Sequence, residues 1–314
     1  MITIGLDTLG GDFAPKAAVD GLLNFYAQDA VNTKSITTVC YGNQAELEAL
    51  FATHPLLTSN IKIVHAPIRI GMHEHPTKAL KTKEDTSIFT GFTALKQQKI
   101  DAFISAGNTG CMLVGSMLYL KTLVGVLRPA VPALIPMLSG KTAVLLDVGL
   151  NADCKPEHLN QFANLGSNYA EQLLGIPNPK VALINIGEEE GKGNILAQAA
   201  YKLLKNNTSI NFIGNAEGRD VLTGSADVLV CDGFVGNIIL KMAESFYGIS
   251  QKLKLQHDYF KRFNFEQYGG VPVLGIENPV IIGHGISGHQ AFKNMINTAV
   301  KMCQIGNNAF KIDG

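Results

Sequence analysis

The sequence has no excess of charge of either sign. Its 314 residues include 26 Lys and Arg and 26 Asp and Glu, which gives a formal net charge of +0 at pH 7. Because binding to nucleic acid relies on concentrated Lys and Arg, this balance argues against nucleic acid as the main partner. With 46% hydrophobic residues, the chain has enough apolar material for a large core, as one big α/β unit or as two lobes.

Paired cysteines are also lacking. The five cysteines are scattered, and none stands in a C-x-x-C pair, which fits buried free thiols in a reducing cytosol. The first residues, Met1–Asp7, lack the basic and cleavage regions of a signal peptide and are typical of a first strand. The apolar segment Cys111–Leu127 is interrupted by polar residues and is shorter than the ~20 residues of a membrane span. We therefore expect a cytoplasmic protein in which this segment is a buried helix.

Several motifs of group-transfer enzymes are missing. No G-x-S-x-G nucleophile elbow occurs, and Ser287 does not fit one. The run Gly187–Asn194 has one residue too few between its glycines for a P-loop, and its three glutamates would repel a polyphosphate. We expect no G-x-G-x-x-G fingerprint after a strand, and therefore no standard dinucleotide site. His73 and His75 could seed a metal site, but a solvated pair of imidazoles is the stronger interpretation, so we assign no metal and no cofactor.

What the sequence does contain is a repeated kind of strand-to-helix junction. Ser105–Gly110, Asn185–Asn194 and Cys231–Asn237 each place Gly and Asn between a strand-like run and a stretch with helical spacing. Glycine lets the backbone approach a ligand closely, and the free N–H groups of a helix start favour an anion. Three such junctions predict a cleft at the carboxyl ends of parallel strands that holds phosphate or another oxyanion.

Strand-like and helix-like runs alternate along the chain, which predicts parallel strands covered by helices on both faces. The predicted strands are Ile2–Leu6, Ile36–Tyr41, Ile61–His65, Ala102–Ser105, Thr142–Asp147, Lys180–Ile184, Asn211–Ile213, Val228–Val230, Val271–Ile276 and Val280–Ile282. The predicted helices are Lys16–Tyr26, Gln44–Phe51, Ser87–Gln98, Thr109–Leu120, Pro156–Leu174, Ile195–Lys205, one from about Val235, and His289–Cys303. Ala66–Lys83 is expected to be a long polar loop. Because no Ser- or Gly-rich linker occurs, we expect a single compact α/β domain over residues 1–314.

The segment from Ala243 to Tyr268 stands apart and is expected to protrude from this domain. Its aromatic and aliphatic residues are interleaved with basic ones, namely Lys252, Lys254, Lys261 and Arg262. A basic amphipathic stretch lies on an anionic membrane or binds an acidic partner. A surface helix with a buried face is an equally good interpretation.

With these motifs, and with Asp7–Pro15, Asp147–Asn151, Gly214–Asp220 and Gly283–Gly285, the chain resembles the bacterial phosphate acyltransferases of the PlsX family over nearly its whole length. The resemblance implies a Rossmann-like three-layer α/β/α fold with a mostly parallel sheet, like isocitrate dehydrogenase and phosphate acetyltransferase, in a homodimer. It implies reversible transfer of a fatty acyl group from acyl-carrier protein to inorganic phosphate. The acyl phosphate would feed a membrane glycerol-3-phosphate acyltransferase in phospholipid synthesis. The segment 238–267 looks shorter than the family's membrane-associating hairpin, which leaves peripheral membrane association open.

The missing nucleophile fits a reaction in which phosphate itself attacks a thioester, so the site must supply proximity and donors for an oxyanion. Lys192 and Asn237 are expected to neutralise charge and stabilise the oxyanion, and His284 is a weaker candidate for protonating the leaving thiolate. Phosphate and acyl binding is assigned to Ser105, Gly107, Asn108, Thr109, Gly110, Asn185, Gly187, Asp232, Gly233 and Gly236. Docking of the acidic carrier protein is assigned first to Lys252, Lys254, Lys261 and Arg262, and second to Lys78, Lys81 and Lys83.

Other interpretations stay open at this point. Lys192 could be a solvated lysine paired with Glu188 or Glu190, and Asn108 and Asn237 could be helix N-caps. The chain could also be a phosphate acetyltransferase-like enzyme that uses acyl-coenzyme A, or a non-catalytic scaffold for carrier protein. The scaffold is disfavoured because all three junctions retain their Asn.

Overall fold

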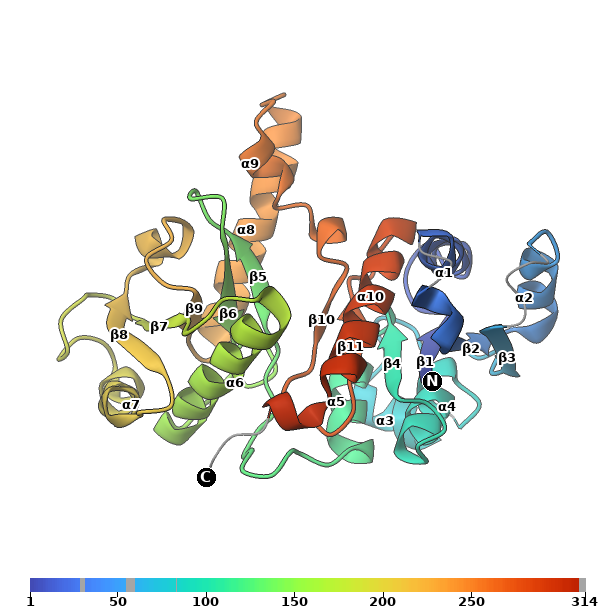
Figure 1. The fold of residues 1–314 in the computed structure, drawn as a ribbon, viewed down its shortest axis with the longest axis horizontal. Helices are drawn as coiled ribbons and strands as arrows, with labels where there is room; N and C mark the ends of the chain where they lie inside the picture. The colour runs from blue at the N-terminus through green and yellow to red at the C-terminus, as the bar shows by residue number, and fades with distance from the viewer. Residues whose placement is uncertain (29–31, 55–59, 83, 311–314) are drawn as a thin grey trace. The chain divides into compact units, whose positions relative to one another are not determined.

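The computed structural model describes residues 1–28, 32–54, 60–82 and 84–310, and two compact units can be distinguished in it (Figure 1). Unit 1 comprises Met1–Lys121 and Phe265–Asn307, and unit 2 comprises Thr122–Asn264 and Asn308–Gly314. Each unit has its own mostly parallel sheet with flanking helices, so the predicted α/β class is confirmed. The single compact domain expected over residues 1–314 stays a prediction.

Among the described residues of unit 1, six strands form a sheet in the order β10-β11-β4-β1-β2-β3. Neighbouring strands are parallel except for β10 and β11, which are antiparallel. The strands are β1 (Ile2–Asp7), β2 (Ile36–Gly42), β3 (Ile61–His65), β4 (Ala102–Ser105), β10 (Gly270–Pro272) and β11 (Val280–Gly283). Every residue of β4 and β11 is buried, as expected for parallel strands covered on both faces.

The helices of unit 1 cover this sheet. They are α1 (Lys16–Gln28), α2 (Gln44–Phe51), α3 (Pro76–Thr82), α4 (Ser87–Lys96), α5 (Thr109–Tyr119) and α10 (His289–Ile305), with 3₁₀ turns η1 (Asn32–Ser35) and η4 (Phe265–Gln267). The 3₁₀ turn η5 (Asn307–Phe310) starts at the last residue of unit 1 and continues into unit 2. α10 packs along α1 and against β11 and β4, while α4 packs against β1, β2 and β4. Gly91 of α4 lies directly over the Phe103 ring, which leaves no room for a Cβ.

The described part of unit 2 contains a five-stranded sheet in the order β5-β6-β9-β7-β8. Its first pair is antiparallel and the other pairs are parallel. The strands are β5 (Ala133–Pro136), β6 (Thr142–Leu146), β7 (Lys180–Ile184), β8 (Asn211–Ala216) and β9 (Val228–Val230). The remaining elements are α6 (Pro156–Leu174), α7 (Ile195–Asn206), η3 (Gly218–Leu222), α8 (Gly233–Lys252) and α9 (Asp258–Lys261). α6 packs against β6, β9 and α7.

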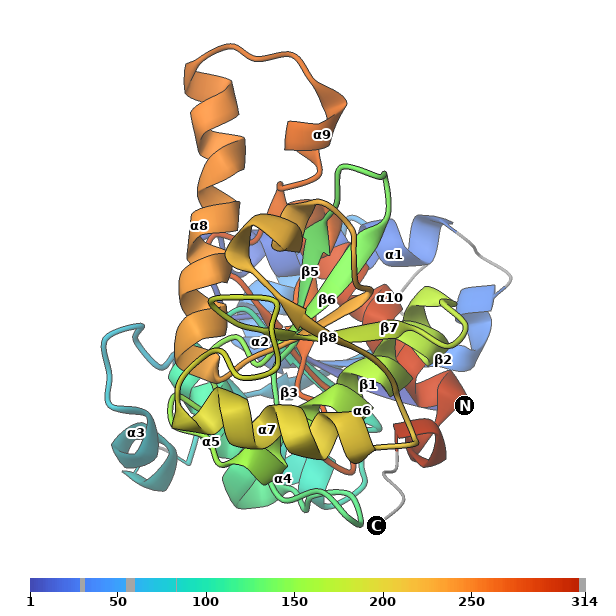
Figure 2. The same ribbon diagram turned by 90° about the vertical axis from the view of Figure 1, so that its left-hand side faces the viewer.

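The helices α8 and α9 form a projection from unit 2. α8 rises beyond the sheet, and residues 253–257 lead the chain back to the short α9 beside it (Figure 2). Phe246 of α8 contacts Phe263, and Phe263 in turn contacts Tyr259 of α9, with ring centroids 5.4 and 5.2 Å apart. Part of the aromatic content of the predicted segment is therefore used to hold the two arms of the projection together.

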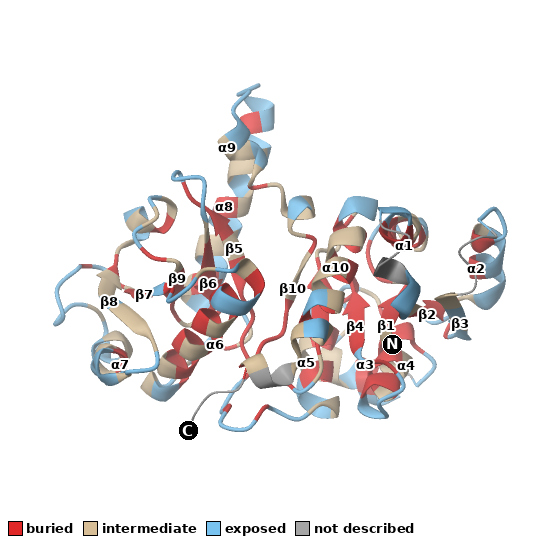
Figure 3. Cartoon of the chain, in the orientation of Figure 1, coloured by how far each residue is buried: buried red, intermediate tan, exposed pale blue. Residues whose placement is uncertain are grey.

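Burial follows the layers within each unit: the inner strands are buried, while the edge strands β3 and β8 and the outer helix faces are mostly half-buried or exposed (Figure 3). Most predicted elements lie within a few residues of the observed ones. Four predictions differ. β5 was not predicted, the expected strand Val271–Ile276 is only β10, and the expected loop Ala66–Lys83 contains α3. The expected buried helix Cys111–Leu127 is helical only as far as Tyr119, and Val124 and Leu127 beyond it are exposed. Among the described residues, no helix is both long enough and apolar enough to cross a bilayer. All five cysteines are free thiols; Cys154 and Cys303 are partly exposed and the others are buried.

Candidate functional site

The predicted site residues of unit 1 lie at the carboxyl ends of adjacent strands. β4 and β11 are parallel neighbours, and Ser105 is in register with Ile282. The junction Ser105–Gly110 and the loop that carries His284 therefore leave the sheet side by side. This is the arrangement that the sequence predicted for an anion site, and within unit 1 it joins the first junction to His284.

Asn108 is the N-cap of α5. Both its side-chain oxygen and its side-chain nitrogen make hydrogen bonds within unit 1. Its Oδ1 accepts a hydrogen bond of 3.0 Å from the backbone N–H of Cys111. Its Nδ2 lies 2.9 Å from the carbonyl oxygen of Gly71 and 3.2 Å from those of Met72 and Glu74. The side chain is buried and ties the loop before α3 to the start of α5. The N-cap interpretation is thus correct, and the Asn108 side chain is engaged in structural hydrogen bonds.

The other members of this junction are close-packed as well. Ser105 is fully buried, and its hydroxyl accepts from the N–H of Gly107 at 2.9 Å. A Cβ at Gly110 would meet the ring of Pro76 at 2.5 Å, so glycine is needed there for packing. Thr109 is exposed at the first position of the helix. These contacts hold the N-terminal turn of α5 in one conformation, which suits a preorganised set of backbone donors.

His284 follows β11 and packs on an aromatic ring. Its ring centroid is 4.9 Å from that of Phe265, with the planes tilted by 32°. Its Nδ1 accepts a long hydrogen bond of 3.4 Å from the N–H of Ile286. The ring contact and the hydrogen bond fix the orientation of the imidazole. Proton transfer by His284 stays a prediction.

The glycine spacing of a dinucleotide fingerprint, G-x-G-x-x-G, does occur at Gly283–Gly288, between β11 and α10. Excluding a fingerprint-like junction from the sequence was therefore wrong. Its phosphate position is nevertheless filled by a carboxylate, because Oε1 of Glu266 accepts a hydrogen bond of 3.0 Å from the N–H of Gly288. No strand follows α10 in the described part of the chain, so the βαβ unit that completes such a site is lacking there.

Unit 2 has a second group of predicted residues at strand ends. β7 and β9 are parallel neighbours with Leu183 in register with Val230, so Asn185 and Asp232 both lie two residues beyond that pair. Asp232 is the N-cap of α8, and its Oδ1 accepts from the N–H of Val235 at 2.9 Å. Since the cap is itself a carboxylate, it already compensates the positive end of this helix.

Asp147 is the buried centre of this second group, a role that the sequence did not predict. Its carboxylate accepts hydrogen bonds from the N–H groups of Val131 and Asn151 at 2.8 and 2.6 Å. Burial raises its pKa, and those hydrogen bonds oppose the rise. Gly233 and Gly236 pack on this turn, and a Cβ at Gly233 would meet Oδ2 of Asp147 at 2.8 Å. The glycines predicted to bind ligand are thus also required for packing.

Asn237 joins α8 to the same turn. Its Nδ2 donates a hydrogen bond of 3.0 Å to the carbonyl oxygen of Val148. It also lies against Gly149, whose φ of 137° is open to glycine and strained for other residues. Asn237 is not the N-cap of α8, because Asp232 holds that position, so the N-cap interpretation of Asn237 is wrong. Its expected role toward an oxyanion stays a prediction.

Lys192 is exposed in the turn between β7 and α7. Its Nζ is 3.9 Å from Oε2 of Glu189, a loose ion pair between two well-exposed side chains. The sequence suggested Glu188 or Glu190 as partners, and this was wrong, since both carboxylates pair with other cations. Cγ of Lys192 lies over Gly187, where a Cβ would stand 2.8 Å away. Glycine at this position therefore lets the lysine stem fold back across the turn.

The residues assigned to carrier-protein docking differ in their freedom. Lys252 and Lys254 are exposed at the end of α8. Lys261 is exposed and pairs with Asp258 at 2.7 Å. Arg262 is committed to structure: its NH1 and NH2 donate to three oxygen atoms of the β5–β6 hairpin, at 3.0, 2.6 and 3.2 Å. In the second set, Lys78 and Lys81 are exposed on α3, and Lys83 lies outside the described residues.

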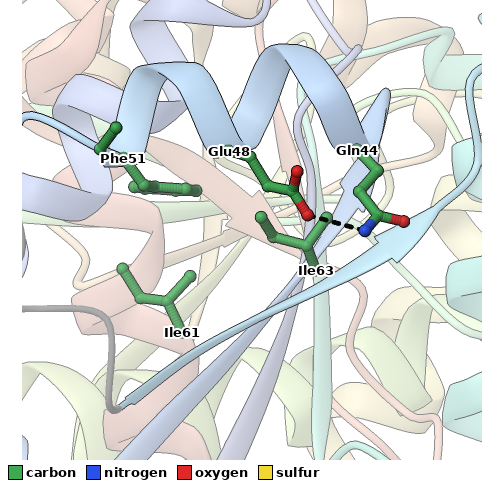
Figure 4. A pocket seen from close by; sticks show the side chains of 6 residues that line it. Gln44, Glu48, Phe51, Ile61 and Ile63 are labelled. Atoms are coloured by element: carbon green, nitrogen blue, oxygen red, sulfur yellow. Dashed lines mark hydrogen bonds between the residues drawn. The ribbon is translucent and has the colours of Figure 1, made fainter.

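A cavity of about 360 Å³ lies elsewhere in unit 1, between α2 and the edge strand β3. Phe51, Ile61 and Ile63 line it, and Nε2 of Gln44 donates to Glu48 at its rim (Figure 4). Two strands, β1 and β2, lie between β3 and β4 in the sheet, so this cavity is remote from the Ser105–Gly110 junction. None of the predicted site residues lines it.

Comparison with known proteins decides the family. A family model described as "Fatty acid synthesis protein" matches residues 2–309. A protein of Dictyoglomus turgidum named "Phosphate acyltransferase" is 42% identical over 330 residues, which is 99% of this chain and 97% of the relative. One of the same name from Desulforamulus reducens is 42% identical, covering 98% of this chain and 95% of the relative. The chain belongs to the PlsX family of phosphate acyltransferases.

Solved structures support the same fold. A phosphotransacetylase from Streptococcus pyogenes superposes with a TM-score of 0.65 at 15% identity, over 96% of this chain and 94% of that one. The EutD phosphotransacetylase from Staphylococcus aureus gives a TM-score of 0.60 at 17% identity, over the same shares of the two chains. At these identities the likeness concerns the fold, and it confirms the phosphate acetyltransferase-like architecture implied by the resemblance.

Proposed function

We propose that this protein transfers a fatty acyl group from acyl-carrier protein to inorganic phosphate and so makes acyl phosphate for phospholipid synthesis. One observation supports the proposal above all: a relative named phosphate acyltransferase is 42% identical to this chain over nearly the full length of both proteins. In the reaction, a phosphate oxygen bonds to the thioester carbonyl carbon, the carbon–sulfur bond breaks, and the thiolate leaves and takes up a proton. Neither a serine nor a cysteine nucleophile is required, because phosphate is itself an anionic nucleophile.

Phosphate is assigned to the first junction, and the reasons are local. α5 begins with a neutral cap, Asn108, so the positive end of this helix is not cancelled by a carboxylate as it is at Asp232. The glycines beside it bring the backbone close to a ligand. Thr109 adds an exposed hydroxyl at the helix start. The hydrogen bond from the N–H of Gly107 to the hydroxyl of Ser105 stabilises this turn.

Lys192 and Asn237 are assigned to the charge that develops on the thioester carbonyl. The exposed ammonium of Lys192 has only a loose carboxylate partner, so little energy is lost when it turns to an anion. Asn185 and Gly187 hold the turn that presents it, and Gly233 and Gly236 hold the start of α8 that presents Asn237. His284 is assigned to protonation of the leaving thiolate.

The projection of unit 2 is proposed to dock the carrier protein. Carrier protein is acidic, and Lys252, Lys254 and Lys261 place exposed ammonium groups on this projection. Arg262 contributes its positive charge from a fixed position against the β5–β6 hairpin. Lys78 and Lys81 on α3 are the second choice for the same role.

A homodimer and a peripheral contact with membrane complete the proposal. One stripe of α8 carries exposed apolar side chains at spacings of four and seven residues, namely Phe234, Ile238, Met242, Ile249 and Leu253. Such a stripe favours a second apolar surface, which a second copy or a lipid headgroup region provides. Sedimentation velocity of the protein, with and without anionic liposomes, separates these two. A membrane glycerol-3-phosphate acyltransferase is the expected consumer of the product.

One assay tests the activity. The purified protein is incubated with acyl-carrier protein and phosphate, and acyl phosphate is trapped with hydroxylamine. Product should form with both substrates and should disappear when phosphate is left out. If only acyl-coenzyme A serves as donor, the phosphate acetyltransferase-like alternative is correct, and if neither donor reacts, the scaffold alternative is.

A further inference from the structure

The turn that carries Lys192, residues 186–193, is held by three side-chain amides. Nδ2 of Asn215 donates to the carbonyl oxygens of Glu188 and Glu189 at 3.4 and 2.9 Å. Nδ2 of Asn185 donates to the carbonyl oxygen of Lys192 itself at 3.1 Å. Nε2 of Gln198, on α7, donates to the carbonyl oxygens of Gly191 and Gly193 at 3.0 Å each. Five of the eight carbonyl groups of this turn thus accept from an amide whose position another element sets.

Asn215 and Asn185 are also joined to each other, which turns separate contacts into one clamp. Nδ2 of Asn185 lies 3.2 Å from Oδ1 of Asn215, and Oδ1 of Asn185 accepts from the N–H of Ile186 at 2.8 Å. Asn185 is buried, and Gly193 is pressed against it, since a Cβ there would meet its Oδ1. Asn185 is thus the buried member of the clamp, while Asn215 is half-buried and Gln198 is exposed. Several linked hydrogen bonds restrict a turn more than any one of them does.

A β-bulge aims Asn215 at this turn. Along the pair of strands β7 and β8, Val181 is in register with Phe212, but Leu183 is in register with Asn215, so β8 has one additional residue. Gly214 lies within the bulge with a φ of 103°, a conformation that glycine adopts without strain. A bulge of this kind reverses the face to which the following side chain points, and bulges are frequent beside active sites.

The carboxylates of the turn are held away from the lysine. Glu190 pairs with Lys205 at 2.8 Å, and Glu188 lies 3.6 Å from Arg219. Each of these cations belongs to another element, α7 or η3. Within the part of the chain that the structure describes, the peptide clamp and the outward pairs together leave the ammonium of Lys192 with one loose carboxylate neighbour, Glu189.

We propose that Asn215 is a positioning residue that sets the conformation of the turn 186–193 and thereby the place of the Lys192 ammonium. This inference rests on the proposed function for its catalytic consequence, because Lys192 acts there on the thioester. Asn215 touches no reacting atom. Its effect on the reaction passes through Lys192, so the two side chains must be energetically coupled.

A double-mutant cycle tests that coupling. Asn215→Asp keeps the shape of the side chain but replaces its N–H donors by an oxygen that repels the carbonyls of Glu188 and Glu189. It should lower kcat/KM for acyl phosphate formation roughly 10- to 100-fold, the scale of a misplaced catalytic group. In a Lys192→Ala background the same change should cost no more than about twofold, since the group it positions is gone. Asn211→Asp is the matched control, because Asn211 lies in the same strand and donates to Asn178 instead.

Hydrogen exchange separates this inference from the proposed function. In Asn215→Asp the amides of residues 186–194 should exchange faster than in wild type, whereas Asn211→Asp should leave them unchanged. If the wild type makes no acyl phosphate, the proposed function fails, and the exchange of these amides still decides whether Asn215 orders the turn. Asn215→Ala is measured beside Asn215→Asp, and the comparison uses whichever retains the wild-type unfolding transition. Unchanged exchange in that variant, or full additivity with Lys192→Ala in an active enzyme, overturns the proposal.

Discussion

The hydroxyl of Ser105 donates a hydrogen bond of 2.6 Å to Oδ2 of Asp7, a residue 98 positions earlier in the chain. The two residues end the neighbouring parallel strands β4 and β1. Oδ1 of Asp7 accepts from the N–H of Leu9 at 2.9 Å. One carboxyl group therefore links the loop after the first strand to the Ser105–Gly110 junction, in the interior of unit 1.

This buried carboxyl should make stability depend on pH. Burial raises the pKa of Asp7 above its ordinary value of 3.8, and its hydrogen bonds with Ser105 and Ser87 oppose the rise. Because the folded state holds the proton more tightly, the stabilisation is complete below 3.8 and is lost as pH rises through the folded-state pKa. The difference in the free energy of unfolding between wild type and Asp7→Asn should therefore decrease as pH rises from 3.8 through the folded-state pKa of Asp7. Denaturant titrations at a series of pH values measure it, and a constant difference would contradict the prediction.

Replacing Asn108 should destabilise unit 1. Asn108→Ala removes the cap of α5 and the amide that joins three carbonyls of the loop before α3. A lost cap together with buried carbonyls left without this donor costs about 1–3 kcal/mol. Urea unfolding measures the loss. Thr109→Ala is the control, because Thr109 is the exposed next residue and should change stability little. Equal stability of the two variants would show that the contacts of Asn108 contribute nothing net.

The sequence predicted the parts of this structure that follow from local pattern. The strands before the three junctions are short apolar runs, and the caps Asn108 and Asp232 stand where Asx caps are preferred. β5 was not predicted because Pro132 precedes it and Pro136 is its last residue. Proline is tolerated mainly in edge strands, and β5 is an edge strand of its sheet. α3 escaped because its seven residues are too few for a clear helical period.

The candidate site was predicted in part for a related reason. Asp147 reads as one of several carboxylates at strand ends, and only its hydrogen bonds with Val131 and Asn151 mark it as the centre of a turn. The direction in which the Asn215 side chain points depends on a bulge that shifts the register of β8 by one residue. Register is set by the pairing of two strands. No pattern along one strand records it, although the pair Gly214-Asn215 is a local signal for a positive φ.

Lys192→Ala should lower kcat/KM by ~10²-fold or more, the scale of losing one contact to transition-state charge. Folding should not change, because the side chain is exposed and its ion pair with Glu189 is loose. Steady-state hydroxylamine assays give the first quantity and thermal unfolding gives the second. Lys202→Ala removes an exposed lysine of α7 and serves as the control. Near-normal turnover of Lys192→Ala would restore the interpretation of a solvated surface lysine.

Reversing the charge of Lys252 and Lys254 should weaken carrier-protein docking. The double variant with Glu at both positions should raise KM for acyl-carrier protein and leave KM for phosphate almost unchanged. Salt should act in the same direction, since exposed charges are screened beyond about 10 Å at 0.1 M. Lys202→Glu provides a charge change of the same sign outside the projection. An unchanged donor KM with lost sedimentation on anionic liposomes would assign these lysines to a membrane instead.

Arg262 and Lys261 are adjacent basic residues with different expected effects. Arg262 donates to the carbonyl oxygens of Met137 and Lys141, whereas Lys261 pairs with the exposed Asp258. Arg262→Ala should therefore detach α9 from the β5–β6 hairpin and speed amide exchange across residues 258–264. Lys261→Ala should leave that exchange unchanged, because an exposed ion pair is screened by solvent. If both variants exchange alike, the contacts of Arg262 do not order this segment, and the aromatic contacts and the hydrogen bond from Tyr259 to Pro136 are what hold it.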